Sequence, residues 1–162
     1  MQGASLEEIE RVYRQRLPEF RRVAAAIVGN REAARDAVQE GFAIAVRKRK
    51  TFRGEGPVDA WLWRVVVNAA REHARRRDEI LDPEAGARAA RNGTSDEEPD
   101  TRVRVALAIL PERQRLALFL RYYADLDYRT TADTLDIAIG TVGVTLSTAH
   151  TKLRELLEEV PQ

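Results

Sequence analysis

The chain has 162 residues, of which 44% are hydrophobic and 33% charged, a balance that favours a folded protein over a disordered one. It contains no cysteine, which excludes a disulfide framework and a thiolate metal site. No apolar run approaches the roughly 20 residues that cross a bilayer, and the acidic start lacks the apolar core of a signal peptide. We therefore expect a cytoplasmic protein without membrane insertion.

The net charge of +1 conceals a strong division along the chain. Residues 1–77 carry a net charge of +7, residues 78–100 carry −6, and residues 101–162 are neutral. Asymmetry of this kind indicates a basic part that faces nucleic acid and an acidic tether.

The first helix is expected to begin at a capping box, Ser5-Leu6-Glu7-Glu8. Apolar residues then recur at helical spacing as far as Val28. Pro18 should kink or split this helix because it lacks an amide donor. The pair Gly29-Asn30 should end it.

Two further helices are expected before the acidic segment. The second runs from about residue 31 to 49, with one apolar face formed by Ala34, Val38, Phe42 and Val46. Glycines and a proline predict a loop over residues 52–57. The third helix continues to about Arg77, with a core stripe formed by Val58, Trp61, Leu62, Val65 and Val66.

Residues 78–101 read as a flexible acidic linker, with one short helical piece near Glu84–Arg91. Helical patterns resume over residues 102–110, 112–124, 128–136 and 140–159. The last two, joined by a three-residue turn, form a helix-turn-helix pattern. The sequence thus predicts an all-α protein with two small helical domains, residues 1–77 and 102–162.

Four fragments resemble the extracytoplasmic-function (ECF) sigma factors of bacterial RNA polymerase. Residues 36–42 (DAVQEGF) look like the family's Asp-x-Val-Gln-Glu-x-Phe signature. Residues 52–55 (FRGE), with 61–65 (WLWRV) and Asn68, resemble its next signature. Residues 110–115 (LPERQR) and 140–142 (GTV) resemble the opening of its C-terminal domain and the start of its recognition helix. Their order and spacing make the resemblance specific.

The resemblance implies a role for each part. By this resemblance, four residues are expected to dock on the clamp helices of the polymerase's largest subunit: Asp36, Gln39, Glu40 and Phe42. Eight residues are expected to bind and melt the −10 element: Arg53, Trp63, Arg64, Asn68, Arg71, Arg75, Arg76 and Arg77. The C-terminal domain is expected to bind the flap of the second-largest subunit and to read the −35 element through Arg129, Thr141, Thr145, Thr148 and Lys152. An anti-sigma factor is an expected further partner.

The composition of residues 47–77 also indicates a surface that binds nucleic acid. Residues 47–77 hold ten basic and three acidic side chains, which suits the neutralisation of phosphates. The aromatic residues among them suit stacking on unpaired bases. Trp61 fits the core stripe and is expected to pack. Trp63 lies off that stripe, so both packing and base stacking stay open for it.

The expected recognition helix is unusual. From Gly140 to Thr151 it contains no Arg, Lys, Asn or Gln, which are the residues that commonly read base edges in the major groove. Its expected N-cap is Ala138 rather than a polar residue. The reading of the −35 element is therefore unusual, weak or lost, and His150 is either a phosphate contact or a surface residue.

The sequence leaves two other classes of function open. The depleted recognition helix favours a sigma mimic that sequesters an anti-sigma factor without reading −35 DNA, but this would leave the basic and aromatic −10 region superfluous. An ordinary helix-turn-helix regulator would leave the N-terminal signatures unexplained. The sequence shows no catalytic constellation, phosphate loop or metal-ligand cluster, so we expect no enzyme, no cofactor and no metal.

Overall fold

A computed structural model describes residues 3–80 and 101–159, and in these residues every regular element is a helix. The N-terminal part contains α1 (Leu6–Val28), α2 (Arg31–Arg47), a short 3-10 helix η1 (Arg49–Thr51) and α3 (Val58–Ile80). The C-terminal part contains α5 (Thr101–Ile109), α6 (Glu112–Tyr122), α7 (Tyr128–Leu135) and α8 (Ile139–Glu159). The prediction of an all-α protein is confirmed, and the short helix expected near Glu84–Arg91 lies outside the described residues.

The ends of α1 follow from local chemistry. The Ser5 hydroxyl accepts a hydrogen bond from the Glu8 amide at 3.1 Å, and the Glu8 carboxylate accepts one from the Ser5 amide at 2.9 Å, so the capping box is confirmed. Gly29 ends the helix with a φ of 89°, a conformation that glycine adopts without a steric penalty. Pro18 does not split α1, which runs unbroken through it.

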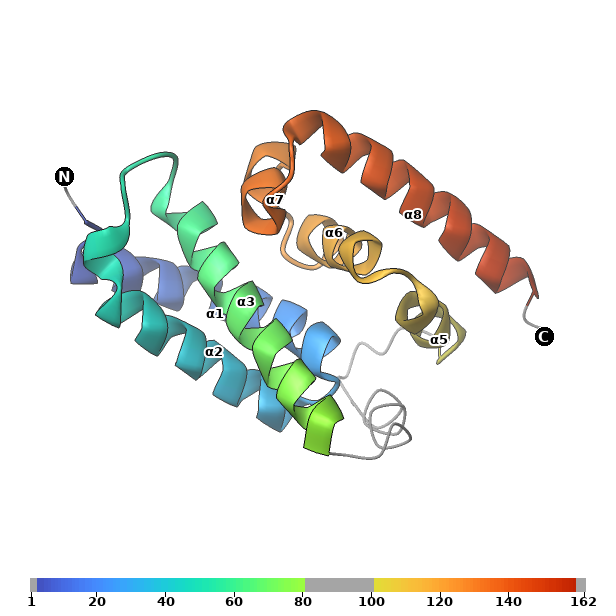
Figure 1. Cartoon of the computed structure of the whole chain (residues 1–162), viewed down its shortest axis with the longest axis horizontal. Coiled ribbons are helices and arrows are strands. Elements are labelled where there is room, and N and C mark those ends of the chain that lie inside the picture. Colours follow the sequence, from blue (N-terminus) through green and yellow to red (C-terminus); the bar gives the residue numbers. More distant parts are fainter. Residues whose placement is uncertain (1–2, 81–100, 160–162) are drawn as a thin grey trace.

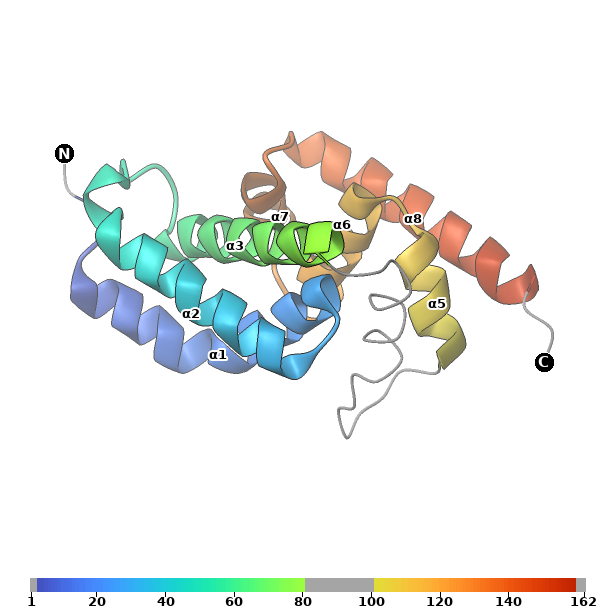
Figure 2. The ribbon, with the colours of Figure 1, turned by 60° about the horizontal axis from the view of Figure 1, so that its bottom comes forward.

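The helices α1, α2 and α3 lie side by side and bury an aromatic centre (Figures 1 and 2). Phe20 of α1 stacks on Trp63 of α3 with ring centroids 4.0 Å apart, and its edge contact with Phe42 of α2 measures 5.1 Å. Gly41 lets α2 approach α3 closely, because a Cβ there would lie 3.0 Å from the Cα of Val66.

The placement of Trp63 at the −10 DNA was wrong, because this side chain is fully buried with 0% exposure. Trp61, expected to pack, is half-buried and packs against the core and against Phe52. The stripe predicted from the sequence lies about one residue, or roughly a quarter of a turn, from the buried face. The reason is that α3 is apolar on several faces, so its pattern alone does not fix which face turns inward.

Replacement of the buried tryptophan should be far more costly than replacement of its neighbour. We expect Trp63→Ala to lower the free energy of unfolding by about 3–5 kcal/mol, because it removes a large buried ring and leaves a cavity. Trp61→Ala should cost about 1 kcal/mol, as for a typical partly exposed position. Urea denaturation followed by circular dichroism measures both, and equal losses would contradict the arrangement.

The helices α7 and α8 form the predicted helix-turn-helix. The Asp127 carboxylate caps α7 by accepting a hydrogen bond from the Thr130 amide at 2.7 Å. Asp136 ends α7 with a φ of 58°. Behind the motif lies a small core shared with α6, formed by Leu110, Ala117, Leu118, Ala132, Val142, Leu146 and Ala149.

The cap at Asp127 gives the helix-turn-helix an acid-sensitive element. Its hydrogen bonds with Thr130 lower the pKa of Asp127, so the ionised carboxylate is favoured in the folded protein. The stabilisation is present above the ordinary aspartate pKa and is lost as the pH falls through the lowered folded value. We expect Asp127→Ala to destabilise the protein by about 1 kcal/mol at neutral pH.

The control for this prediction is Asp127→Asn, whose amide oxygen still caps the helix and should preserve most of the stability. Thermal unfolding at a series of pH values compares the variants. The advantage of the wild type over Asp127→Ala should shrink in acid, whereas that of Asp127→Asn should not. An advantage of the wild type that grows in acid would refute the assignment.

The helix α6 is buried on two sides and joins both halves of the molecule. Ala117 and Leu118 belong to the helix-turn-helix core, whereas Leu116, Phe119 and Leu120 belong to the larger core built by α1, α2 and α3. Figure 1 shows α6 and α7 lying between α3 and α8. Apolar residues from both halves therefore share one core in this arrangement, which was not predicted from the sequence.

Candidate nucleic-acid and polymerase interface

One exposed stripe of α3 carries the residues expected to meet the −10 element. Arg64, Asn68, Arg71 and Arg75 follow one another at spacings of four, three and four residues, so they lie on one face. All four are exposed, while Leu62, Trp63, Val66, Val67 and Ala70 beside them are buried. Because these neighbouring side chains are buried in the core, the four polar side chains point to the surface.

The basic end of α3 is partly occupied by other groups. Arg75 donates to the Glu72 carboxylate, and Arg76 lies 3.7 Å from Glu72 and 3.9 Å from Glu40. The Arg75 hydrogen bond is the main cause that lowers the pKa of Glu72. Arg77 donates to the Val28 carbonyl at 3.2 Å and so ties α3 to the end of α1.

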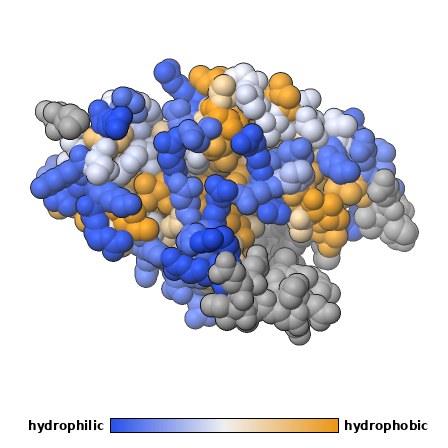
Figure 3. Space-filling model, viewed as in Figure 1, coloured by the Kyte–Doolittle hydropathy of each residue, from blue (hydrophilic) through white to orange (hydrophobic). Residues whose placement is uncertain are grey.

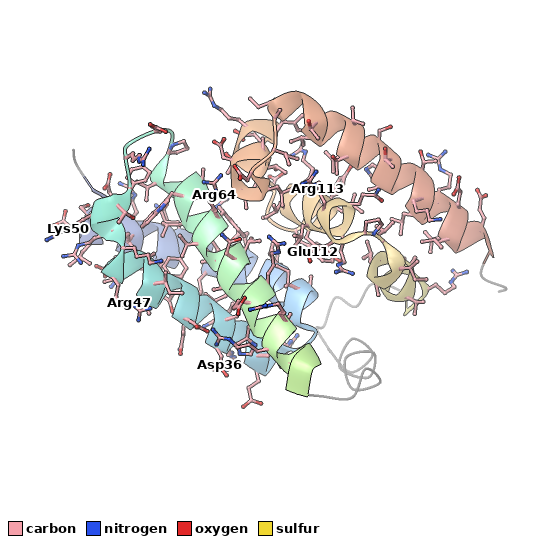
Figure 4. The ribbon with its side chains drawn as sticks, viewed as in Figure 1. Asp36, Arg47, Lys50, Arg64, Glu112 and Arg113 are labelled. Atoms are coloured by element: carbon pink, nitrogen blue, oxygen red, sulfur yellow. The ribbon has the colours of Figure 1, made fainter. Side chains whose placement is uncertain are left out.

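A second basic group lies at the other end of the N-terminal helices. Arg47, Lys48, Lys50 and Arg53 are exposed around η1 and the loop that leads to α3. Figure 4 shows Arg47 and Lys50 at the end of the molecule farthest from the C-terminal helices. Phe52 of this loop is buried, so it is not available to stack on a base.

The residues expected to dock on the polymerase lie on α2. Asp36 and Gln39 are exposed and Glu40 is half-buried, and Figure 4 shows Asp36 on the side of α2 away from the C-terminal helices. Phe42 was predicted to anchor this patch, but it is only 7% exposed and its ring meets Tyr13 and Phe20 edge-on. The patch is therefore polar, and Phe42 is a core residue because its side chain points to α1.

The recognition helix presents a mixed surface. Arg129, Thr148 and Lys152 are exposed and Thr141 is half-buried, as a contact with DNA requires. Thr145 is only 8% exposed, so its prediction as a base reader was wrong, because its position on α8 faces inward. Apolar side chains surround these polar ones: Tyr128, Ile139 and Val144 are exposed, and Figure 3 shows an apolar area over the α7–α8 turn.

His150 has a structural partner in the C-terminal part. Its Nε2 lies 2.7 Å from the Tyr122 hydroxyl oxygen, and the two rings meet edge-on. This contact links α6 to α8.

Several polar contacts between the two halves were not foreseen from the sequence. Arg64 donates to the Asp133 carbonyl and to the Asp136 carboxylate, each at 3.0 Å, and Arg71 pairs with Glu112. One feature of the sequence is consistent with packing between the two halves. Residues 116–120 (LALFL) form a continuous apolar run, which indicates a helix covered on more than one side.

Neither a membrane span nor a metal site emerges from the described residues. Within residues 3–80 and 101–159, no helix has both the length and the apolar character needed to cross a bilayer. The same residues contain no group of three or more His, Asp or Glu side chains placed to hold a metal ion.

Comparison with known proteins identifies the family. Residues 12–80 match the family model of sigma-70 region 2, and residues 100–153 match that of sigma-70 region 4. The ECF RNA polymerase sigma factor EcfG of Rhodopseudomonas palustris is 30% identical over 145 residues, which cover 87% of this chain and 80% of the relative. The RNA polymerase sigma-E factor of Streptomyces antibioticus is 28% identical over 159 residues, covering 97% and 88%.

Solved structures share the fold. The sigma factor RpoE of Bartonella quintana, solved in complex with the anti-sigma factor NepR, aligns with a TM-score of 0.70 at 24% identity, covering 96% of this chain and 100% of the other. CnrH, solved with the cytosolic domain of CnrY, aligns with a TM-score of 0.72 at 20% identity, covering 98% and 92%. The chain belongs to the ECF family of RNA polymerase sigma factors, which are transcription initiation factors.

Proposed function

We propose that this sigma factor docks on core RNA polymerase through the polar patch of α2 and opens the −10 element with the exposed stripe of α3. The observation that carries the proposal is the stripe itself, in which Arg64 and Arg71 flank Asn68 on one exposed face. Arginines suit phosphate contacts, and an amide can read the Watson–Crick edge of an extruded base. The functional domains are residues 1–77 and 102–162, connected by the acidic segment 78–101.

The remaining basic residues extend this binding surface. Arg53 lies exposed beside η1, and Arg75 and Arg76 continue the stripe beyond Arg71. We assign them phosphate contacts that strengthen binding without reading sequence. Arg77 is assigned mainly to anchoring α3 on α1, because its guanidinium already donates to Val28.

The C-terminal domain binds the polymerase flap and meets the −35 region with few base-specific groups. Arg129, Thr148 and Lys152 are exposed and Thr141 is half-buried, and we assign the −35 contacts of the helix-turn-helix to these four residues. Val144, which is 66% exposed, is placed to contact apolar groups such as a thymine methyl. We therefore expect weak discrimination among −35 sequences.

Loss of the amide at position 68 should impair promoter opening rather than assembly with the polymerase. In run-off transcription with core polymerase and fragmented genomic DNA, the wild type should produce discrete transcripts. Asn68→Ala should reduce open-complex formation about tenfold, since one base-reading contact is worth roughly 1–3 kcal/mol, while affinity for the core stays unchanged.

Gln15→Ala, which removes an exposed amide from α1, is the matched control and should behave like the wild type. An equal loss of core binding and of promoter opening in Asn68→Ala would refute the assignment. The upstream sequences of the transcripts show whether a −35 element is shared.

Reversal of charge on α2 should disrupt docking. Asp36→Arg combined with Glu40→Arg should weaken core binding by about 30-fold, because central interface residues are often worth 2 kcal/mol or more. The control is Glu155→Arg with Glu158→Arg, which makes the same charge change on exposed positions of α8. A direct binding assay with labelled protein measures both, and unchanged affinity of the α2 variant would remove the docking proposal.

A sigma mimic that sequesters an anti-sigma factor is the second candidate. The apolar exposure of Ile139 and Val144 on the recognition helix favours a protein contact there. The similar sigma factor RpoE was solved with an anti-sigma factor, and we propose a partner of that class for this chain under either function. Absence of transcripts with intact core binding would favour the mimic.

A further inference from the structure

The first turns of α8 present an exposed valine on the helix that is expected to meet −35 DNA. Val144 is 66% exposed, the highest value for a large hydrophobic side chain in the part of the chain that the structure describes. Its neighbours Val142, Leu146 and Ala149 are buried in the helix-turn-helix core, so they fix the rotation of α8 about its own axis. Figure 1 shows α8 along the outer edge of the C-terminal helices. The fold therefore holds Val144 outward.

The surface around Val144 consists of small, uncharged residues. Gly140 precedes it by four residues, and Ser147 and Thr148 follow it by three and four, so all of them lie on one face of α8. Each of them is exposed. This face offers hydroxyl and methyl groups but none of the long amide or cationic side chains that commonly read base edges.

Two glycines allow this face to approach the floor of a groove closely. A Cβ added at Gly140 would meet nothing within 4 Å, and one added at Gly143 would make only an ordinary contact with Tyr128 at 3.7 Å. Packing therefore requires glycine at neither position, although glycine weakens a helix interior relative to alanine. Glycine serves where a backbone approaches a ligand closely. With no side chain at either position, the methyl groups of Val144 can reach a base edge.

Val144 is an isolated apolar group rather than part of an apolar face. Ile139, the other exposed large apolar side chain of α8, lies five residues earlier, which corresponds to about 140° around the helix. A partner protein that docked on this face would meet one valine among hydroxyl groups instead of an apolar stripe. The major groove matches this arrangement, because the 5-methyl group of thymine lies there among hydrogen-bonding groups of the bases.

We propose that Val144 sets the −35 preference of this sigma factor by packing on the 5-methyl group of one thymine. The inference rests on the proposed −35 contact of the helix-turn-helix. Arg129 and Lys152, both exposed, hold phosphates and fix the register, since such contacts position a protein without reading sequence. One methyl contact then separates thymine from cytosine, which agrees with weak discrimination overall. A 5-methylcytosine at this position carries the same methyl group and should bind better than cytosine.

Removal of the methyl group alone tests the inference. Deoxyuridine differs from thymidine only in lacking the 5-methyl group, so each thymine of the −35 region is replaced singly in a promoter duplex identified by run-off transcription. Core polymerase with the wild-type sigma factor should bind one of these duplexes about fourfold more weakly, as expected for one buried methyl group. With Val144→Ala, the thymine and deoxyuridine duplexes should bind equally. Competition measured by fluorescence anisotropy gives each affinity.

The matched control is Ile139→Ala, which also shortens an exposed apolar side chain of α8 but on another face. This variant should keep the fourfold ratio between the two duplexes. Both positions are at least half exposed, so neither change should unfold the protein, and circular dichroism verifies this.

A gain of binding provides a second readout. A C·G pair at the sensitive position should weaken binding, and a 5-methyl group on that cytosine should restore about fourfold with the wild type. The same methyl group should restore nothing with Val144→Ala.

The outcomes separate this inference from the proposed function. If no thymine depends on its methyl group, or if the dependence survives in Val144→Ala or disappears in Ile139→Ala, this inference is overturned. A duplex with a scrambled −35 region tests the proposed −35 contact itself. If scrambling leaves affinity unchanged, or no transcripts are obtained, that contact fails and this inference fails with it, and the exposed valine belongs to a protein-binding surface. If scrambling weakens binding but the methyl group has no effect, only this inference fails.

Discussion

The stacking of Phe20 on Trp63 is the contact on which the functional surface depends. With ring centroids 4.0 Å apart and Trp63 fully buried, this contact fixes the rotation of α3 about its own axis. Once that rotation is set, Arg64 and Asn68 point outward, because they lie one and five residues beyond Trp63 along the helix. A rotation by one residue would place either Arg64 at the buried position of Trp63 or Trp63 at the exposed position of Arg64.

The second constraint is the two-sided burial of α6. One side of this helix completes the helix-turn-helix core through Ala117 and Leu118, and the other side enters the core of α1, α2 and α3 through Leu116, Phe119 and Leu120. A helix with two apolar faces must cover both or expose one to water. In this structure both faces are covered within the chain.

These two constraints meet at the exposed stripe of α3. The contact that buries α6 also brings Glu112 and Asp136 to the arginines of α3, so one apolar surface and one charged surface are covered together.

The sequence by itself determined the helical class, the family and much of the outline of the fold. The Ser5–Glu8 capping box, the stop at Gly29 and the helix-turn-helix depend on neighbours only a few residues apart, and such local hydrogen bonds are readable from the chain. Asp36 and Asn68, the polar residues of the family signatures, both lie on exposed faces. The assignments of those residues to particular contacts remain predictions.

Only the tertiary structure decided which face of each helix turns inward and how the two halves meet. Trp63, Phe42 and Thr145 were expected at binding surfaces but are buried, because each lies on a helix with more apolar or small residues than one narrow stripe requires. The pairing of Arg64 with Asp136 joins residues 72 positions apart. No local pattern encodes such a contact, since it arises only when α6 buries its second apolar face against α1, α2 and α3.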